Sequence, residues 1–157
     1  MPRGGTNDLD RSGAPWENRR VEDDAAMTRA VRASHVRLKR AYAPADPTDG
    51  LRILVDRLWP RGISKAEARL NGWMKDIAPS PELRTWFDHD PLRWDEFRAR
   101  YRAEINRHRA AMHDLRVLAR SGVITLVYSA RDEQHNDAVV LRNAILGRPL
   151  LQEPDND

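Results

Sequence analysis

The stretch LRILVDRLWPRG, from Leu51 to Gly62, decides how the rest of the sequence is interpreted. Four of its first five residues are apolar, which is typical of a strand that is buried on both faces of a sheet. Asp56 and Arg57 follow directly, and a charged pair at the end of a buried strand is costly unless it is paired or used. Pro60 has no N–H to donate and ends the strand that we predict over residues 51–58, and Gly62 permits a sharp exit turn.

Composition excludes several classes of protein. The chain has 157 residues, which is enough for one domain with a substantial core, and it contains no cysteine. Disulfides, thiolate metal sites and cysteine nucleophiles are therefore excluded, and a reducing cytoplasm is the expected compartment. We also find no apolar run of membrane-spanning length and no signal-peptide core, and we predict no membrane association.

Charge and composition divide the chain into three parts. Residues 1–33 carry equal numbers of acidic and basic side chains with few large apolar residues, and we predict a flexible leader there. Residues 34–150 form the predicted folded domain, with 21 Lys and Arg against 15 Asp and Glu. Residues 151–157 form a loose acidic tail. The basic domain allows a phosphate-bearing or nucleic-acid partner, but its arginines are not clustered in the sequence, so the charge alone supports this only weakly.

The segments around the first buried strand contain shorter elements. Residues 35–42 alternate in polarity, which predicts an edge strand that is either antiparallel to residues 51–58 or separated from them. Ser64 is a suitable cap for a short helix over residues 65–70. Residues 73–77 are predicted as a short strand or an extended segment.

The second half begins with helices and continues to another buried strand. Ser80 and Pro81 predict the start of a helix over residues 82–87. Apolar residues at helical spacing predict one long helix or two successive helices over residues 92–120, which end at Gly122. Residues 123–128 predict a second buried strand, which is followed by an exit loop and a last helix over residues 134–146. The sum is a small single α/β domain with a short, mostly parallel sheet flanked by helices.

Polar side chains follow both buried strands, and ligands in open parallel sheets bind beyond the carboxyl ends of the strands. If the two strands are neighbours, these side chains face one crevice. The first strand contributes Asp56, Arg57, Trp59, Arg61 and Gly62. The second strand contributes Tyr128, Ser129, Arg131, Asp132, His135 and Asn136.

Acid–base chemistry is the first chemistry that this set suggests. Asp56, Asp132 and His135 are the candidate catalytic residues, because histidine and carboxyl groups exchange protons in enzymes. The same groups suit a hard metal ion, but we assign no metal ligand and no cofactor. The alternative is that His135 caps the last helix or pairs with Asp132. A hydrolytic triad of Ser129, His135 and Asp132 is disfavoured, because the glycines of a nucleophile elbow are absent.

Anion binding is the second kind of chemistry that these residues suggest. The planar guanidinium groups of Arg57 and Arg61 suit carboxylate or phosphate, and the alternative is that Arg57 only pairs with Asp56 or Asp132. A nucleotide cradle built from a glycine-rich loop is disfavoured, because no glycine lies between Val123 and Leu146. Trp59 is a candidate for stacking on a ligand, with core packing as the alternative.

Several of these motifs together resemble a known family. They are VDRLWPRG at residues 55–62, WMK at 73–75, APS at 78–80, ELR at 82–84, WF at 86–87, TLVYSA at 125–130 and HN at 135–136. The chain is similar over about residues 36–146 to the YeaO-like branch of the bacterial DUF488 family, a domain of unknown function. The resemblance implies a compact α/β domain and no established catalytic residue. Relatives often carry a cysteine motif near the position of His135 and Asn136, and this sequence has none.

One main hypothesis and two alternatives follow from these residues. We expect a small enzyme or binding domain for an anionic, nucleotide-like small molecule at the ends of the strands. The alternatives are a non-catalytic nucleic-acid-associated module and a protein-interaction module that uses the arginine-rich face of the long helix. The latter predicts an exposed apolar stripe. Substrate, reaction and oligomeric state are not indicated.

Overall fold

The computed structural model describes residues 30–150, so the predicted tail and nearly all of the predicted leader lie outside the described residues. Four parallel strands form one sheet in the order β1-β4-β2-β3. They are β1 (Val36–Arg40), β2 (Leu51–Leu54), β3 (Gly72–Trp73) and β4 (Ile124–Tyr128). The predicted α/β class with a parallel sheet is thereby confirmed.

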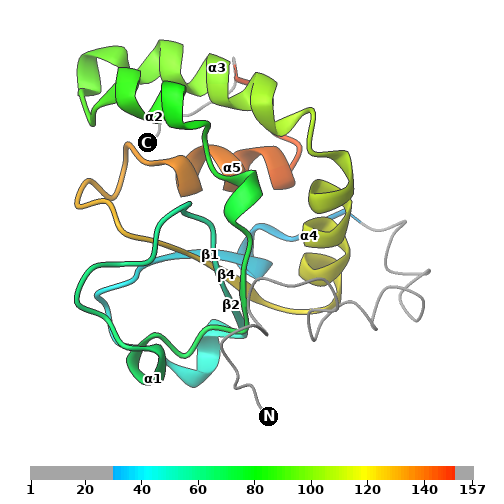
Figure 1. The fold of residues 1–157 in the computed structure, drawn as a ribbon. Helices are drawn as coiled ribbons and strands as arrows, with labels where there is room; N and C mark the ends of the chain where they lie inside the picture. The colour runs from blue at the N-terminus through cyan, green and yellow to red at the C-terminus, as the bar shows by residue number, and fades with distance from the viewer. Residues whose placement is uncertain (1–29, 151–157) are drawn as a thin grey trace.

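Helices cover one face of this sheet in two layers. α5 lies between the sheet and α3, and α4 stands beside α5 (Figure 1). The helices are α1 (Lys65–Ala68), α2 (Pro81–Phe87), α3 (Trp94–Ile105), α4 (Arg109–Ser121) and α5 (Asp137–Ile145). Short 3-10 turns cover Ala33–His35, Pro47–Asp49, Lys75–Ile77 and Pro91–Arg93.

The two buried strands lie side by side, as the functional hypothesis requires. Leu51 of β2 is paired with Ile124 of β4, and the parallel register continues to the end of β2. Beyond β2, the N–H of Val55 still donates to the carbonyl of Val127 at 3.1 Å. The side chains that follow each strand therefore emerge at the same edge of the sheet.

The position of the edge strand β1 decides between the two predicted alternatives, antiparallel pairing with β2 or separation from it. β1 pairs with β4 in parallel, so β4 separates β1 from β2. The expected separation is confirmed, and the antiparallel alternative is wrong. Residues 41–50 return the chain from the end of β1 to the side of the sheet where the strands begin, so β2 runs parallel to β1. β4 then lies between these two strands.

The helix boundaries differ from the prediction at α1 and α5. α1 ends at Ala68, because Arg69 adopts a left-handed conformation. Residues 92–120 contain two successive helices, α3 and α4, which is one of the two predicted alternatives. α5 starts three residues later than predicted, because the side chain of Asn136 accepts a hydrogen bond from Val139 N–H and caps the helix. Residues 73–77 contain the end of β3 and a 3-10 turn.

Alternate residues of the two central strands face two cores. On the helix side, Ile53, Val55 and Leu126 pack with the buried residues of α2–α5. On the other side, Leu54 and Val127 form a smaller cluster. Partly buried Trp59, Leu70 and Trp73 cover this second cluster, so the segment between β2 and β3 replaces a helical layer.

A buried ion network holds the opposite edge of the sheet, where the strands begin. Asp49 is fully buried and accepts from Lys39 Nζ at 2.9 Å and from Arg52 Nη1 at 2.7 Å. Arg52 also donates to the carbonyl of Ala68, at 3.0 Å from Nε and 2.8 Å from Nη2. Burial opposes the charge of Asp49, yet these donors and the N–H of Asp46 lower its pKa. The network links β1, β2 and α1.

Removing this carboxylate leaves Lys39 and Arg52 without their partner and also ends a longer contact, of 4.0 Å, with Arg37. We expect Asp49→Asn to lower the free energy of unfolding by about 3 kcal/mol, because breaking a buried ion pair costs more than forming it gains. Urea denaturation at pH 7 measures the change. Asp46→Asn, which alters an exposed turn cap beside it, is the control and should cost only about 0.3 kcal/mol, because asparagine caps about as well as aspartate. Equal losses in the two variants would contradict a special role of Asp49.

Gly50 and Gly62 provide a matched test of a close backbone approach. Both have positive φ angles, of 64° and 81°. A Cβ on Gly50 would lie 2.1 Å from the carbonyl oxygen of Val123, whereas a Cβ on Gly62 would have no neighbour within 4 Å. Gly62→Ala should therefore cost about 1 kcal/mol from its backbone conformation alone. Gly50→Ala should cost at least about 2 kcal/mol more, measured by urea denaturation, because a backbone group must move. Equal costs would contradict the close approach.

Candidate functional site

A cavity of about 650 Å³ opens beyond the carboxyl ends of β2 and β4. Its walls come from the loop after β2, the second half of α2, the first turn of α3, the loop after β4 and the start of α5. The polar lining residues are Tyr42, Asp56, Arg57, Trp59, Arg61, Arg84, His89, Ser129, Arg131, Asp132, Asn136 and Asp137. The apolar lining residues include Leu58, Pro60, Phe87 and Phe97. The two predicted strand ends thus share one cavity.

Two carboxyl groups meet in this cavity. The Ser129 N–H donates to Asp56 Oδ2 at 2.8 Å, which ties the exit of β4 to the exit of β2. The Asp56 carboxyl group also shares a hydrogen bond with Asp137, the first residue of α5. A hydrogen bond between two carboxyl groups requires one proton, so it can form only when one of the two groups is protonated.

The pKa of Asp137 reflects this neighbourhood. Burial raises it well above the usual range, and the charge and hydrogen bond of Asp56 raise it further. The Ala138 N–H, 3.0 Å from Asp137 Oδ1, opposes the shift. Paired carboxyl groups whose ionisation is linked in this way are common in acid–base sites.

Four arginines line the cavity without a carboxylate partner. Arg57, Arg61, Arg84 and Arg131 line the same cavity as the three aspartates, yet within residues 30–150 none of the four forms an ion pair with a carboxylate. Arg57 Nη2 has only two long contacts, each of 3.4 Å, to the carbonyls of Ala78 and Pro79. Its Nε is buried and has no acceptor in the described part of the chain. The alternative in which Arg57 pairs with Asp56 or Asp132 is therefore not what the structure contains.

Asp132 and His135 pair with each other. His135 Nδ1 lies 2.9 Å from Asp132 Oδ2, and Asp132 Oδ1 accepts from the N–H groups of Gln134 and His135. Burial opposes the charge of Asp132, but these hydrogen bonds lower its pKa. The ring of His135 packs edge-on against Trp94 at 5.0 Å, and His135 does not line the cavity. Ser129 Oγ is buried without a hydrogen-bond partner among the described residues, so no Ser–His–Asp relay is assembled.

The other predicted site residues divide between the cavity and the core. Trp59 lines the cavity, donates to the Ile63 carbonyl at 2.6 Å and packs against Trp73. Asn136 lines the cavity and caps α5. Tyr128 is buried in the main core and shares a hydrogen bond with Asn136, and burial raises the pKa of its hydroxyl. Gly62 is exposed and does not line the cavity.

Several lining residues were not predicted. Asp137 was missed because an aspartate in the first turn of a helix is favourable for the helix dipole and needs no other explanation. Arg84 and Phe87 come from α2, His89 from the turn after it and Phe97 from α3. Their sequence pattern indicates an amphipathic surface but not which strand end it covers. The family motifs around residues 84 and 87 were the only available signal.

Other types of site are not supported within the described chain. No group of three or more His, Asp or Glu side chains in residues 30–150 is arranged to hold a metal ion. No helix in this part of the chain is both long and apolar enough to cross a bilayer. Exposed large apolar side chains in the same residues are Tyr42, Leu58 and Leu92, which lie on three separate segments and form no stripe on α3 or α4.

The fold and cavity define a small α/β domain with a polar crevice at the carboxyl edge of its sheet, and comparison with known sequences gives its family. Residues 35–157 match the family described as "Inactive DUF488-N3 subclade", so the chain belongs to the DUF488 family, as its motifs predicted. No solved structure gives a significant match.

Similar proteins come from two bacterial lineages. The uncharacterised protein Rv3073c of Mycobacterium tuberculosis strain H37Rv is 46% identical over 118 residues, which are 75% of this chain and 99% of that protein. The uncharacterised protein Mb3100c of Mycobacterium bovis has the same identity and coverage. The uncharacterised protein YeaO of Escherichia coli strain K12 is 44% identical over 107 residues, 68% of this chain and 93% of that protein. The YeaO-like assignment is therefore confirmed.

The carboxyl pair makes a prediction about stability and pH. Because the fold raises the pKa of Asp137, stability falls as pH rises above about 3.9, where the unfolded chain releases this proton and the folded protein does not. Asp137→Asn keeps a donor towards Asp56 and removes this decline. We expect the variant to match the parent at pH 4 and to gain about 1 kcal/mol, or about 4 °C in melting temperature, at pH 8.

The control for this experiment has the opposite sign. The pKa of Asp132 is lowered, so its ionised form stabilises the fold at neutral pH and this contribution is lost in acid. Asp132→Asn should therefore be less stable than the parent at pH 8 and approach it at low pH. Melting curves from pH 3 to 9 measure both variants. A stability loss at pH 8 for Asp137→Asn would contradict a raised pKa of Asp137 in the folded protein.

Proposed function

We propose that this domain binds a small anionic ligand with hydroxyl groups, such as a sugar phosphate or a nucleotide, in the cavity beyond β2 and β4. The observation that carries the proposal is the set of four arginines around this cavity without a carboxylate partner in the described chain. Arg57 is half-buried and its buried Nε has no acceptor in the described chain, whereas the other three arginines line the cavity from exposed positions. A buried guanidinium N–H without an acceptor is costly, and an anion would supply that acceptor. The cavity volume of about 650 Å³ is within the range of small-molecule sites.

The remaining lining residues favour a ligand with two kinds of surface. Ser129 Oγ and the Asp56–Asp137 pair would exchange hydrogen bonds with hydroxyl groups, as carboxyl groups do in sugar sites. Phe87, Phe97 and Pro60 offer an apolar wall for the flat face of a sugar ring or base. The description of the family as inactive favours binding without turnover.

Thermal shift at pH 7.5 tests the proposal with a graded panel: inorganic phosphate, ribose 5-phosphate, adenosine monophosphate and ribose. The phosphorylated compounds should stabilise the protein, and ribose alone should not. At ten times Kd, the expected stabilisation is about 1.4 kcal/mol. The variant Arg61→Gln/Arg131→Gln removes two exposed cavity arginines and should lose most of the shift. Arg93→Gln/Arg100→Gln, which removes the same charge outside the cavity, should keep it.

Two outcomes of this experiment would overturn the proposal. Identical shifts in both double variants would mean that anions act elsewhere on the surface. No shift with any phosphorylated compound, measured up to millimolar concentration, would remove the anionic ligand. The double variants avoid Arg57, because a loss of folding there would be mistaken for a loss of binding.

A catalytic form of the same proposal rests on the carboxyl pair. Two carboxyl groups that share a proton provide an acid and a base in one place, which suits proton transfer to and from a bound ligand. Incubation with the best ligand of the panel, followed by mass spectrometry, would detect a product. In a catalyst, Asp137→Asn should retain binding and lose turnover by at least about 100-fold. Absence of any product with the parent protein would leave binding as the function.

A further inference from the structure

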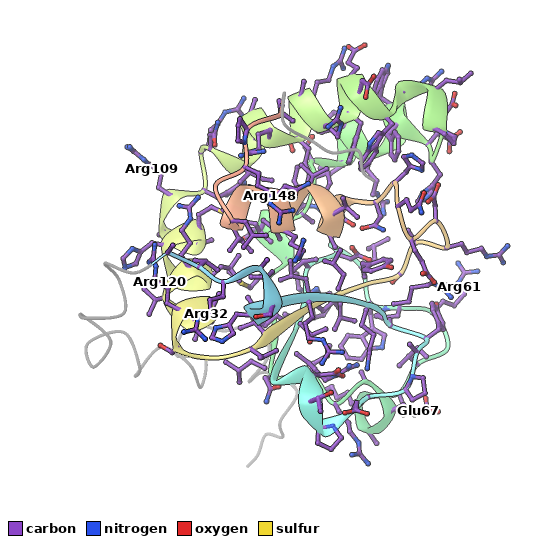
Figure 2. The ribbon with its side chains drawn as sticks, turned by 180° about the vertical axis from the view of Figure 1, so that it is seen from behind. Arg32, Arg61, Glu67, Arg109, Arg120 and Arg148 are labelled. Atoms are coloured by element: carbon purple, nitrogen blue, oxygen red, sulfur yellow. The ribbon has the colours of Figure 1, made fainter. Side chains whose placement is uncertain are left out.

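β1 is the outermost strand on one side of the sheet, because it pairs with β4 and with no other strand of the described chain. Figure 2, which views the molecule from behind, shows β1 in front of the other strands, with Arg32 before its start and Arg61 on the side where it ends. An outer strand directs part of its backbone N–H and C=O groups away from the sheet, where another chain can bond to them.

The pairing with β4 identifies the backbone groups of β1 that face outwards. The Ala41 N–H, directly after β1, donates to the carbonyl of Tyr128 at 2.6 Å. Backbone groups of successive residues in a strand point to opposite sides, so every second residue before Ala41 also faces β4. The backbone groups of Val36, Leu38 and Arg40 therefore face away from β4.

Both ends of this outer row are closed by the chain itself. The Val36 N–H donates to the carbonyl of Ala33, and the Val36 carbonyl accepts from Arg142 Nε at 2.5 Å. At the other end, the Arg40 carbonyl accepts from the Ala43 N–H at 3.0 Å. The chain thus limits any added strand to the middle of β1.

Three backbone groups remain open between these closed ends. The N–H and C=O of Leu38 and the N–H of Arg40 have no hydrogen-bond partner within residues 30–150. An extended segment beside β1 would bond to all three, and main-chain bonds of this kind hold added strands at sheet edges. The Leu38 side chain is half-buried against the main core and offers an apolar contact at the centre of the row.

The side chains around this edge carry more positive than negative charge. Five cations and two carboxylates belong to the group: Arg32, Arg37, Lys39, Arg52, Arg142, Asp46 and Asp49. Lys39 and Arg52 share Asp49, and Arg37 is 4.0 Å from the same carboxylate. Within residues 30–150, Arg32 and Arg142 form no ion pair with a carboxylate. The excess positive charge favours an acidic partner.

A second copy of this chain is a poor occupant of the edge. If two β1 strands pair antiparallel with Leu38 opposite Leu38 of the copy, Arg37 lies opposite Lys39 of the copy. Centring the pair on Arg37 or on Lys39 places that cation opposite the same cation of the copy. Like charges directly opposite each other in a sheet are destabilising. The cations that favour an acidic strand therefore oppose edge-to-edge dimerisation.

We propose that β1 docks an extended acidic segment of a partner protein, which adds to the sheet as a fifth strand. Side chains alternate along a strand, so the partner residue opposite Leu38 should be apolar and its two neighbours, opposite Arg37 and Lys39, should be acidic. The recognised sequence is thus an acidic, an apolar and an acidic residue in succession. Residues 32–40 do not line the cavity, so the inference is independent of the ligand proposed there.

Hydrogen exchange of single amides, measured by NMR on the full chain at pH 7, tests the inference. In the free protein, the amides of Arg37 and Lys39 face β4 and should exchange at least about 100-fold more slowly than those of Leu38 and Arg40. The probe is a peptide with Glu-Val-Glu at its centre and two threonines on each side. At ten times Kd it should slow exchange at Leu38 and Arg40 about 10-fold, because about one-tenth of the protein remains free.

Fluorescence anisotropy with the labelled peptide tests the contribution of charge. Arg32→Glu/Arg37→Glu reverses two exposed cations at the edge and should weaken binding about 10-fold. Arg93→Glu/Arg100→Glu makes the same change in charge on the surface around α3 and should bind as the parent does. A peptide with Lys-Val-Lys at its centre should not bind the parent. If the edge variant has a lowered melting temperature, Arg32→Glu alone should still weaken binding about 3-fold.

Four results would overturn the inference. The first is similar exchange at Leu38 and Lys39 in the free protein. The second is no effect of the acidic peptide on the Leu38 amide at millimolar concentration. The third is the same peptide affinity in the two double variants. The fourth is a concentration-dependent dimer that protects the Leu38 amide without peptide, since this would assign the edge to a second copy.

Discussion

The parallel pairing of β2 with β4 is the constraint on which the site depends. Each strand is too apolar to lie at an edge, and each is followed directly by charged or polar residues. Placing the strands side by side in parallel brings both exits to one edge, where the Ser129 N–H meets the carboxylate of Asp56. That hydrogen bond continues the ladder beyond the last strand residues. An antiparallel arrangement of the same two strands would have sent the two polar segments to opposite edges.

The opposite edge of the sheet has a different physical character. There Asp49 is enclosed with Lys39 and Arg52, and each charged group has its partner. At the carboxyl edge, charged groups surround a cavity, and Arg57 Nη2 has only two long contacts, both to backbone carbonyls. The first edge pairs its charges internally, and at the second the buried Nε of Arg57 has no acceptor within residues 30–150. This contrast, more than the number of charges, distinguishes a structural network from a candidate binding site.

Much of the fold could be predicted from the sequence, because its strongest signals are local. The apolar runs of β2 and β4, the Ser80–Pro81 start of α2 and the end of α4 at Gly122 each depend on a few adjacent residues. The strand order was not predictable in the same way, because the position of β1 depends on where residues 41–50 return the chain. The burial of Asp49 was also not predictable, since an aspartate before a glycine is ordinarily an exposed turn residue.

Only the site residues that directly follow β2 and β4 in the sequence could be predicted. The rule that ligands bind beyond the carboxyl ends of parallel strands located Asp56, Arg57 and Ser129. It could not locate Arg84 or Phe87, because the position of α2 over the exits results from packing against α3. Nor could it distinguish Asp132, which pairs with His135, from Asp137, which faces Asp56. Asp132 lies in the exit loop and Asp137 in the first turn of α5, and the sequence does not show which of the two interacts with Asp56.

The division between the two edges of the sheet also has an evolutionary consequence. The ion network around Asp49 and the close approach of Gly50 to Val123 sit at the edge remote from the cavity, and they anchor three elements without contributing to it. The loops at the cavity can therefore accumulate substitutions while the anchor maintains the scaffold. Descendants of one ancestral gene can in this way keep a common architecture and lose, exchange or acquire a chemistry.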